Sequence, residues 1–164
     1  MKKLLIALFL FASSGMVAAA QDFKENEVGF VFSATNFPGQ TEAGVGGRFL
    51  YNFTSIAGFE FTGTFYPVDR SVNYYHGTFN FKGTYRMEQR YKVNFFGFIG
   101  PGFFVADPNP GKADFNGALT AGGGVEGVLR PNVVGRADFA DLVIFSRGAH
   151  TNNFDFKLSL MYRW

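Results

Sequence analysis

The chain has 164 residues, of which 15 are Lys or Arg and 13 are Asp or Glu, and it contains no cysteine. An apolar share of 47% against a charged share of 17% excludes an intrinsically disordered chain, because there is ample apolar surface to bury. The lack of cysteine excludes a disulfide scaffold and any thiolate nucleophile or metal site. The length predicts one domain.

Residues 1–20 have the layout of a bacterial secretory signal peptide. Two lysines follow the initiator Met, residues 4–12 are an unbroken apolar run, and Ala18 and Ala20 form an A-x-A-like cleavage site. The apolar run is too short for a membrane-spanning helix, which needs about 20 residues. We therefore predict cleavage after Ala20 and a single mature domain over residues 21–164.

The predicted mature chain has no net charge. Lys2 and Lys3 leave with the signal, so 13 basic residues remain against 13 acidic ones. A neutral chain without a basic run gives no electrostatic reason to bind nucleic acid. We therefore expect no nucleic-acid partner.

Apolar and polar residues alternate with a period of two along most of the mature chain, which predicts β-strands. Near the C-terminus, Phe154, Phe156 and Leu158 fall on one face, while Asp155 and Lys157 fall on the other. The same reading gives eight strands, at residues 27–35, 43–53, 56–66, 77–87, 92–105, 117–129, 133–141 and 153–164.

The predicted connections alternate between short and long. The short ones contain turn-forming residues and lie at 54–55, 88–91 and 130–132. The long ones lie at 36–42, 67–76, 106–116 and 142–152. Short turns at one end and longer loops at the other are typical of transmembrane β-barrels, where the short turns are periplasmic. Residues 142–145 are apolar enough to extend the seventh strand.

The apolar face of the predicted strands carries eighteen aromatic rings. They are Phe30, Phe32, Phe49, Tyr51, Phe53, Phe59, Phe61, Phe65, Phe79, Phe81, Tyr85, Phe95, Phe103, Phe139, Phe154, Phe156, Tyr162 and Trp164. An eight-stranded barrel has a lumen just wide enough for ordinary side chains, so these rings must face outward. A continuous outward apolar belt requires lipid around it. The predicted fold class is all-β, an eight-stranded antiparallel up-and-down transmembrane β-barrel.

Two other β folds have the same alternation. A soluble β-sandwich would bury the rings between two sheets, but the alternating loop lengths and the charges recurring at facing positions of the polar face disfavour it. A lipocalin-like barrel would point the apolar face into a ligand cavity, and here that face is too large.

The C-terminal strand carries a more specific pattern: Phe156, Leu158, Leu160, Tyr162 and Trp164 are apolar at alternate positions and end on an aromatic residue. In this respect the chain resembles the small outer-membrane β-barrels typified by the transmembrane domain of outer membrane protein A, over essentially all of the mature chain. Phe is the commoner last residue in that family. The resemblance implies that these five residues signal to the barrel-assembly machinery.

The same resemblance implies a place in the bacterial outer membrane, with outer-membrane lipids as the surroundings and no cofactor. It leaves the oligomeric state open. Tyr51, Phe53, Tyr162 and Trp164 are expected at one lipid headgroup boundary, where amphipathic rings are favoured.

Charged residues on the polar face predict ion pairs inside the barrel. The candidate lumen network is Glu27, Arg48, Glu60, Lys82, Arg86, Glu126, Arg136, Asp138, Asp155 and Lys157. A tight turn at 54–55 would set Arg48 across from Glu60, and the turn near residue 131 would set Glu126 across from Arg136. Glu27 is expected near Arg163. Charges in a narrow lumen need partners, because an unpaired buried ion costs several kcal/mol.

These features favour a structural or surface role, for membrane integrity or adhesion, with a lumen plugged by ion pairs. A narrow gated pore for small solutes is the alternative. A lipid A-modifying hydrolase or acyltransferase has less support: His76 has Asp69 and Ser71 nearby, and His150 has Asp141 and Ser146.

No metal-ligand spacing or phosphate-binding motif is present, so we predict no catalytic, cofactor or metal site. The glycines at 122, 123 and 124 lie within a predicted strand and indicate close packing in the lumen rather than a nucleotide loop.

Overall fold

The computed structural model describes residues 26–37, 40–69, 72–87, 93–108, 111–146 and 149–164. The predicted signal peptide and its cleavage site lie outside these residues. The described residues form eight strands: β1 (Asn26–Phe37), β2 (Gln40–Asn52), β3 (Ala57–Asp69), β4 (Val72–Arg86), β5 (Val93–Pro108), β6 (Asp114–Arg130), β7 (Val133–Ser146) and β8 (Ala149–Arg163).

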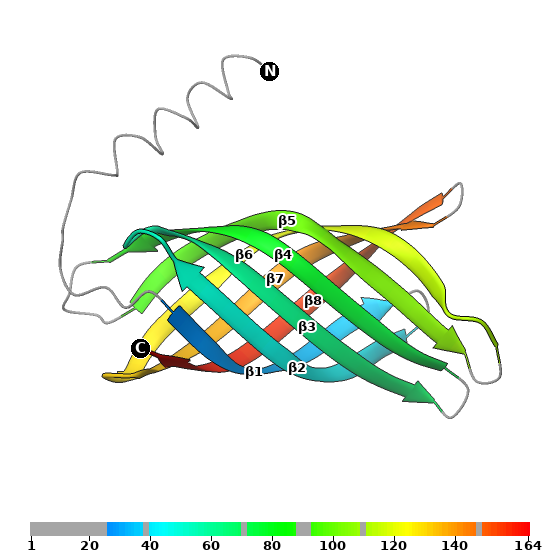
Figure 1. The fold of residues 1–164 in the computed structure, drawn as a ribbon, viewed down its shortest axis with the longest axis horizontal. Helices are drawn as coiled ribbons and strands as arrows, with labels where there is room; N and C mark the ends of the chain where they lie inside the picture. The colour runs from blue at the N-terminus through cyan, green and yellow to red at the C-terminus, as the bar shows by residue number, and fades with distance from the viewer. Residues whose placement is uncertain (1–25, 38–39, 70–71, 88–92, 109–110, 147–148) are drawn as a thin grey trace, which may run out of the picture.

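Each strand pairs antiparallel with its neighbours in sequence, and β1 pairs with β8 to close the barrel (Figure 1). Closure leaves no free sheet edge, so the backbone donors and acceptors of the wall are satisfied within the sheet. The predicted eight-stranded up-and-down barrel is therefore confirmed. The C-terminus and the turns 53–56 and 131–132 lie at one end of the barrel (Figure 1).

The opposite end differs from the prediction, because most residues assigned to long loops belong to strands. Pairing continues out to Phe37↔Gln40, Asp69↔Val72 and Ser146↔Ala149. The polar and glycine residues there look like loop formers, but cross-strand hydrogen bonding outweighs weak β-propensity. The predicted asymmetry in loop length is therefore wrong, whereas the extension of the seventh strand through residues 142–145 is confirmed.

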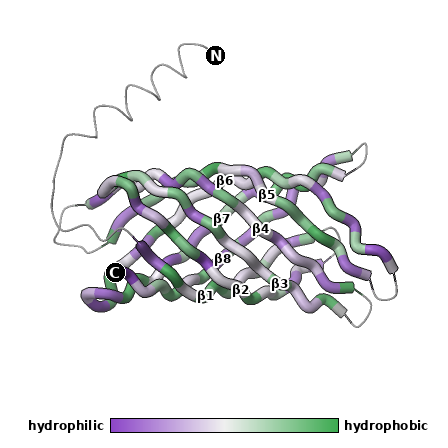
Figure 2. Tube along the Cα trace, viewed as in Figure 1, coloured by the Kyte–Doolittle hydropathy of each residue, from purple (hydrophilic) through white to green (hydrophobic). Residues whose placement is uncertain are grey.

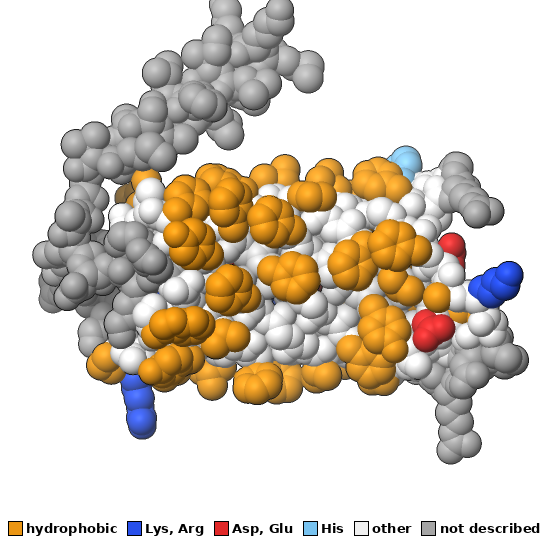
Figure 3. Space-filling model, in the orientation of Figure 1, with side chains coloured by type: hydrophobic (Ala, Val, Ile, Leu, Met, Phe, Trp, Pro, Cys, Tyr) orange, Lys and Arg blue, Asp and Glu red, His pale blue; other side chains and the backbone are white. Residues whose placement is uncertain are grey.

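Buried and exposed residues alternate along the strands, and hydrophobic and hydrophilic residues alternate along the trace (Figure 2). All eighteen predicted rings occupy outward positions. Sixteen of them are between 36% (Phe53) and 75% (Phe30) exposed, and the other two, Phe65 and Phe156, are partly buried. On the face drawn in the space-filling view, apolar side chains are spread over the wall between the two ends, and the charged side chains seen there lie near those ends (Figure 3).

Outward rings also contact one another across strands. Phe59 and Phe79 stack with ring centroids 5.4 Å apart, and the rings of Phe139 and Phe156 are 4.8 Å apart. Such cross-strand aromatic pairs stabilise a sheet. These two pairs link β3 to β4 and β7 to β8.

The predicted ring of amphipathic residues lies at one rim. Tyr51 pairs with Asn26, and the backbone N–H of Trp164 donates to the Asn26 carbonyl oxygen at 3.1 Å. The rings of Tyr162 and Trp164 stack with centroids 6.3 Å apart. Tyr51, Tyr162 and Trp164 therefore share the end of the barrel where β1 begins and β8 ends.

Candidate functional site in the barrel lumen

Most of the predicted lumen residues are almost completely buried. Glu27, Arg48, Glu60, Lys82, Glu126, Arg136, Asp138, Asp155 and Lys157 all have at most 4% of their surface exposed. They lie on the inward phase of their strands because the outward phase holds the apolar residues. The alternation that builds the belt therefore also concentrates charge inside the barrel.

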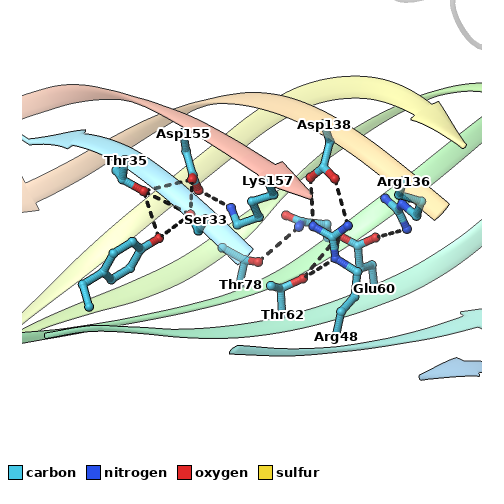
Figure 4. A network of polar contacts seen from close by, with 12 residues as sticks. Ser33, Thr35, Arg48, Glu60, Thr62, Thr78, Arg136, Asp138, Asp155 and Lys157 are labelled. Carbon is cyan, nitrogen blue, oxygen red and sulfur yellow. Dashed lines mark hydrogen bonds and ion pairs between the residues drawn. The ribbon is translucent and has the colours of Figure 1, made fainter. Parts of the chain in front are cut away.

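The central group joins four charges from three strands (Figure 4). Arg48 on β2 forms a bidentate pair with Asp138 on β7, with Nη1 to Oδ1 at 2.9 Å and Nη2 to Oδ2 at 2.8 Å. Arg48 also forms an ion pair with Glu60 on β3, with Nε 3.6 Å from Glu60 Oε1. The other carboxylate oxygen, Glu60 Oε2, lies 2.8 Å from Arg136 Nη1. Two cations and two carboxylates thus compensate one another across the lumen.

A second pair lies beside this group. Lys82 Nζ on β4 is 2.6 Å from Glu126 Oε2 on β6, and the Asn94 side-chain amide donates to the other Glu126 oxygen at 3.2 Å. The ring of Phe96 lies between the two groups, with Arg136 Cζ 4.1 Å and Lys82 Nζ 4.9 Å from its centroid. The ring face attracts both cations in a site shielded from water.

Nearer the end opposite the C-terminus, a hydroxyl cluster surrounds Asp155 on β8 (Figure 4). Ser33 and Thr35 on β1 donate to Asp155 Oδ1 at 2.7 and 2.9 Å. Lys157 forms an ion pair with the other carboxylate oxygen. The Tyr66 hydroxyl lies 2.9 Å from both Ser33 and Thr35 oxygens. Ser33, Thr35, Asp155 and Lys157 come from the two strands that close the barrel, and Tyr66 comes from β3.

The rim near the C-terminus holds a further ion pair. Glu27 and Arg163 are directly opposite in the β1–β8 register, and Arg163 Nη2 is 2.7 Å from Glu27 Oε1. Arg86 is exposed at the end of β4, opposite Asn94, and makes none of the ion pairs found in the described ranges. The structure therefore does not join Arg86 to the other predicted network residues.

One predicted pairing is wrong in register. Arg48 lies opposite Thr62, and Glu60 lies opposite Leu50. The turn is longer than the two residues expected at 54–55, because Thr54 N–H bonds to the Ala57 carbonyl oxygen. A slip of two residues keeps both side chains on the inward face. Arg48 and Glu60 therefore still approach, but diagonally.

Glu126 lies directly opposite Arg136, as the sequence predicts. Their ion pairs nevertheless go to other strands, from Glu126 to Lys82 and from Arg136 to Glu60. In a narrow barrel a long side chain reaches across the lumen as easily as it reaches a neighbouring strand. Sequence reasoning from adjacent strands misses such partners.

An apolar layer inside the barrel was not predicted. Near the end opposite the C-terminus, one buried cluster consists of Phe37, Tyr66, Phe104, Ala118, Leu142 and Ile144, with Val68, Tyr74 and Ala106 packed against it. The ring of Phe37 lies within 5.5 Å of those of Tyr66, Tyr74 and Phe104. The sequence signal that could have indicated this layer is the presence of apolar residues at the otherwise polar, inward positions of several strands near the end opposite the C-terminus.

His76 and His150, the two candidate catalytic histidines, were expected in loops, but both lie in strands. His76 is inside β4 with 3% of its surface exposed, and its Nε2 makes no hydrogen bond to the described residues. His150 is exposed in β8, paired with Phe145. Asp141 faces outward on β7, and Ser71 lies outside the described residues. The strands extend past the predicted loop boundaries, with His76 facing the lumen and Asp141 and His150 exposed.

Gly122 and Gly124 of β6 lie close to residues of the neighbouring strands β5 and β7. A Cβ at Gly122 would collide with the Phe139 carbonyl oxygen and lie 2.8 Å from the Phe98 ring, and one at Gly124 would collide with the Ala137 carbonyl oxygen. These contacts agree with the close packing expected from residues 122–124.

Within the described ranges, no group of three or more His, Cys, Asp or Glu residues could hold a metal ion. In the same ranges, no helix is long and apolar enough to cross a bilayer.

No protein-family model and no curated protein matches the chain. Solved structures do match its fold. The N-terminal β-barrel domain of Pseudomonas aeruginosa OprF superposes with a TM-score of 0.65 at 9% identity, covering 87% of this chain and 100% of that one. Pseudomonas aeruginosa OprG gives 0.62 at 10% identity, covering 86% and 96%. Ail of Yersinia pestis gives 0.58 at 16% identity, covering 86% and 97%. This chain therefore has the fold of the small eight-stranded outer-membrane β-barrels.

Proposed function

We propose that the mature chain, residues 21–164, is an integral outer-membrane barrel with a structural or surface role and a lumen closed by its own side chains. The observation that carries the proposal is the sorting of side chains across the wall. Apolar rings cover the outside, while nine charged residues are buried inside. This arrangement is stable where the outer solvent is hydrocarbon.

Several features support a membrane-spanning barrel. The strands have 12 to 17 residues, which exceeds the 9 to 11 or so that a tilted strand needs to cross the hydrocarbon. The signal-like residues 1–20 would direct export through the inner membrane. The alternating apolar residues of β8, from Phe156 to Trp164, would then serve as the assembly signal.

Closure of the lumen is supported by two layers in series. The ion-paired layer around Glu60 compensates its own charges, so it offers a passing ion no unpaired site. The layer around Phe37 and Leu142 is built mainly of apolar side chains, and the Tyr66 hydroxyl within it is already hydrogen-bonded to Ser33 and Thr35. A solute would have to displace both layers to cross, which disfavours the pore alternative.

A surface role has support from the fold of Ail, which is named an attachment invasion locus protein and has been solved with the heparin analogue sucrose octasulfate. The end of this barrel opposite the C-terminus presents Glu42, Asp107, Lys112 and Asp114 among its described charges. Three of these four described charges are acidic.

A lipid-modifying activity has little support. The hydroxyls of Ser33 and Thr35 donate to Asp155, whereas the buried His76 makes no side-chain hydrogen bond to a hydroxyl in the described residues. A base that activates a serine needs that hydrogen bond. We therefore assign the cluster a structural role.

Planar-bilayer recording tests the closed lumen. We expect the purified, refolded chain to show heat-modifiable migration on a gel and no large, steady conductance, because both layers of the lumen are occupied. The heat-denatured chain in the same lipid is the control. Large, steady single-channel steps from the folded form would contradict the closed lumen and favour the pore.

A further inference from the structure

A row of glycines crosses the outer face of the barrel on β2, β3 and β4. Gly47, Gly63 and Gly77 lie directly opposite one another in the pairing of these strands. They occupy outward positions, because residues beside them, such as Arg48 and Thr62, are buried in the lumen. A Cβ at Gly63 would have no heavy atom within 4 Å. The wall therefore lacks side chains along this row.

Large outward side chains border the glycine row on both sides. They form two rows across the same strands, Val45, Phe65 and Tyr75 toward the end opposite the C-terminus, and Phe49, Phe61 and Phe79 toward the other end. The rings of Phe65 and Tyr75 are 5.1 Å apart. Phe103 on β5 is paired with Gly77, and a Cβ on Gly77 would collide with the Phe103 ring. This ring therefore lies over Gly77 and closes the row on the side of β5.

Between these side chains lies an apolar groove, the Gly63 groove, with a volume of about 320 Å³. Its lining includes Val45, Gly63, Phe65, Tyr75 and Phe103. Thr64 and His76 also border it, but they are only 4% and 3% exposed and their side chains face the lumen. The groove therefore presents hydrocarbon and aromatic surface to the outside of the barrel.

The Gly63 groove lies within the membrane-spanning part of the wall. Gly63 is the central residue of β3, which runs from Ala57 to Asp69. Beyond Tyr75, the next outward residue of β4 is the polar Asn73. Amphipathic rings such as that of Tyr75 are favoured where hydrocarbon meets the headgroups. The groove thus runs from the middle of the wall toward the polar boundary at the end opposite the C-terminus.

From these observations we propose that the Gly63 groove binds one acyl chain of a membrane lipid whose headgroup lies near Tyr75 and Asn73. The inference rests on the proposed membrane location. Within a bilayer the hydrophobic effect does not distinguish one apolar partner from another, so van der Waals packing selects them. An acyl chain in the groove contacts its floor and both borders, whereas a chain lying over the ring-covered wall is contacted from one side.

The width of the groove favours an acyl chain over a protein segment. Phe61 and Phe65, on the two borders, are four residues apart on β3, which corresponds to about 13 Å between their Cα atoms. Their rings narrow this space, so an α-helix with a diameter of roughly 10 to 12 Å does not enter. The wall of a second barrel would contact the bordering rings before it reached Gly63.

The volume of the groove also suits an acyl chain. A single alkyl chain is no thicker than an extended aliphatic side chain. If a methylene group takes roughly the 30 Å³ of a water molecule, the groove accommodates about ten of them. This is a large part of one lipid tail.

Photolabelling of the refolded chain in vesicles tests the acyl-chain site. The vesicles consist of phosphatidylethanolamine and phosphatidylglycerol, with a small fraction of phosphatidylethanolamine that carries a diazirine midway along one acyl chain. Mass spectrometry then locates the label. We expect labelling of Tyr75 roughly fivefold or more above that of Phe139 and Phe154 on the opposite wall, because the chain in the groove has more contacts to hold it.

Substitutions in the groove should remove this excess. Gly63→Leu should lower the labelling of Tyr75 roughly fivefold or more, because the new side chain fills the groove. Gly117→Leu is the matched control, since a Cβ at this outward glycine of β6 also has no heavy atom within 4 Å. Phe103→Leu removes the ring that closes the groove beside β5 and should also lower the labelling of Tyr75, so it serves if Gly63→Leu does not fold.

Two results would overturn the acyl-chain site in chains that show heat-modifiable migration. One is labelling of Tyr75 equal to that of Phe139, and the other is an excess that persists in both Gly63→Leu and Phe103→Leu. Either result, with label on the other outward residues, would leave the membrane barrel in place. A folded chain whose outward residues take up no label anywhere would instead refute the proposed membrane location.

Discussion

Replacing Glu60 with Gln should lower the free energy of unfolding by about 3 to 5 kcal/mol, the largest effect we expect from one substitution. Glu60 is 1% exposed and compensates both Arg48 and Arg136. Gln preserves the volume but removes the charge, so Arg48 would keep only Asp138 and Arg136 would lose the carboxylate with which it forms an ion pair. Urea titration of folded and unfolded chain in lipid vesicles measures this loss.

Ser159→Ala is the matched control in the lumen. Ser159 is 7% exposed, and its hydroxyl has no partner among the described residues, so its removal should change stability little. If Glu60→Gln were as mild as Ser159→Ala, the ion-paired layer would not contribute to stability. The account of the lumen as a charge-compensated interior would then be incorrect.

Replacing Phe81 with Arg should destabilise the barrel by about 2 to 4 kcal/mol, because the guanidinium would project into hydrocarbon. Phe81 is 47% exposed on the outward face of β4, between Phe59 on β3 and Ile99 on β5. Its ring also lies 6.1 Å from that of Phe53. Equilibrium unfolding in lipid vesicles measures the effect.

Thr84→Ser, on the inward face of the same strand, is the control and should be nearly silent. The substitution removes one methyl group at a partly buried position. Equal tolerance of Phe81→Arg and Thr84→Ser would mean that the two faces of the wall are assigned backwards.

The barrel itself was predictable because a strict period of two predicts both that a segment is a strand and which of its side chains face outward. Phe154 to Trp164 illustrate this: the outward and inward sets are separated without any knowledge of the neighbouring strands. Strand ends were less predictable. Segments around Val72 and Ala149 contain turn-forming residues, and only pairing with a neighbouring strand keeps them extended.

Membership of the lumen was more predictable than its contacts. Arg136 on β7 pairs with Glu60 on β3, and Arg48 on β2 pairs with Asp138 on β7. These partners are far apart in the strand order and meet only because the barrel is narrow. The apolar cluster around Phe37 and Leu142 required the same three-dimensional information, because each residue alone breaks the alternation of its strand.

Tryptophan quenching by brominated lipid tests most directly which solvent the outer face meets. Trp164 is the only tryptophan, so Phe79→Trp and Phe98→Trp can each be placed in a Trp164→Phe background and refolded into vesicles. Phe79 is 51% exposed outside and Phe98 is 6% exposed inside. We predict strong quenching at position 79 by lipids brominated along the acyl chain and little at position 98. Quenching at 98 but not at 79 would contradict a barrel whose aromatic belt faces hydrocarbon.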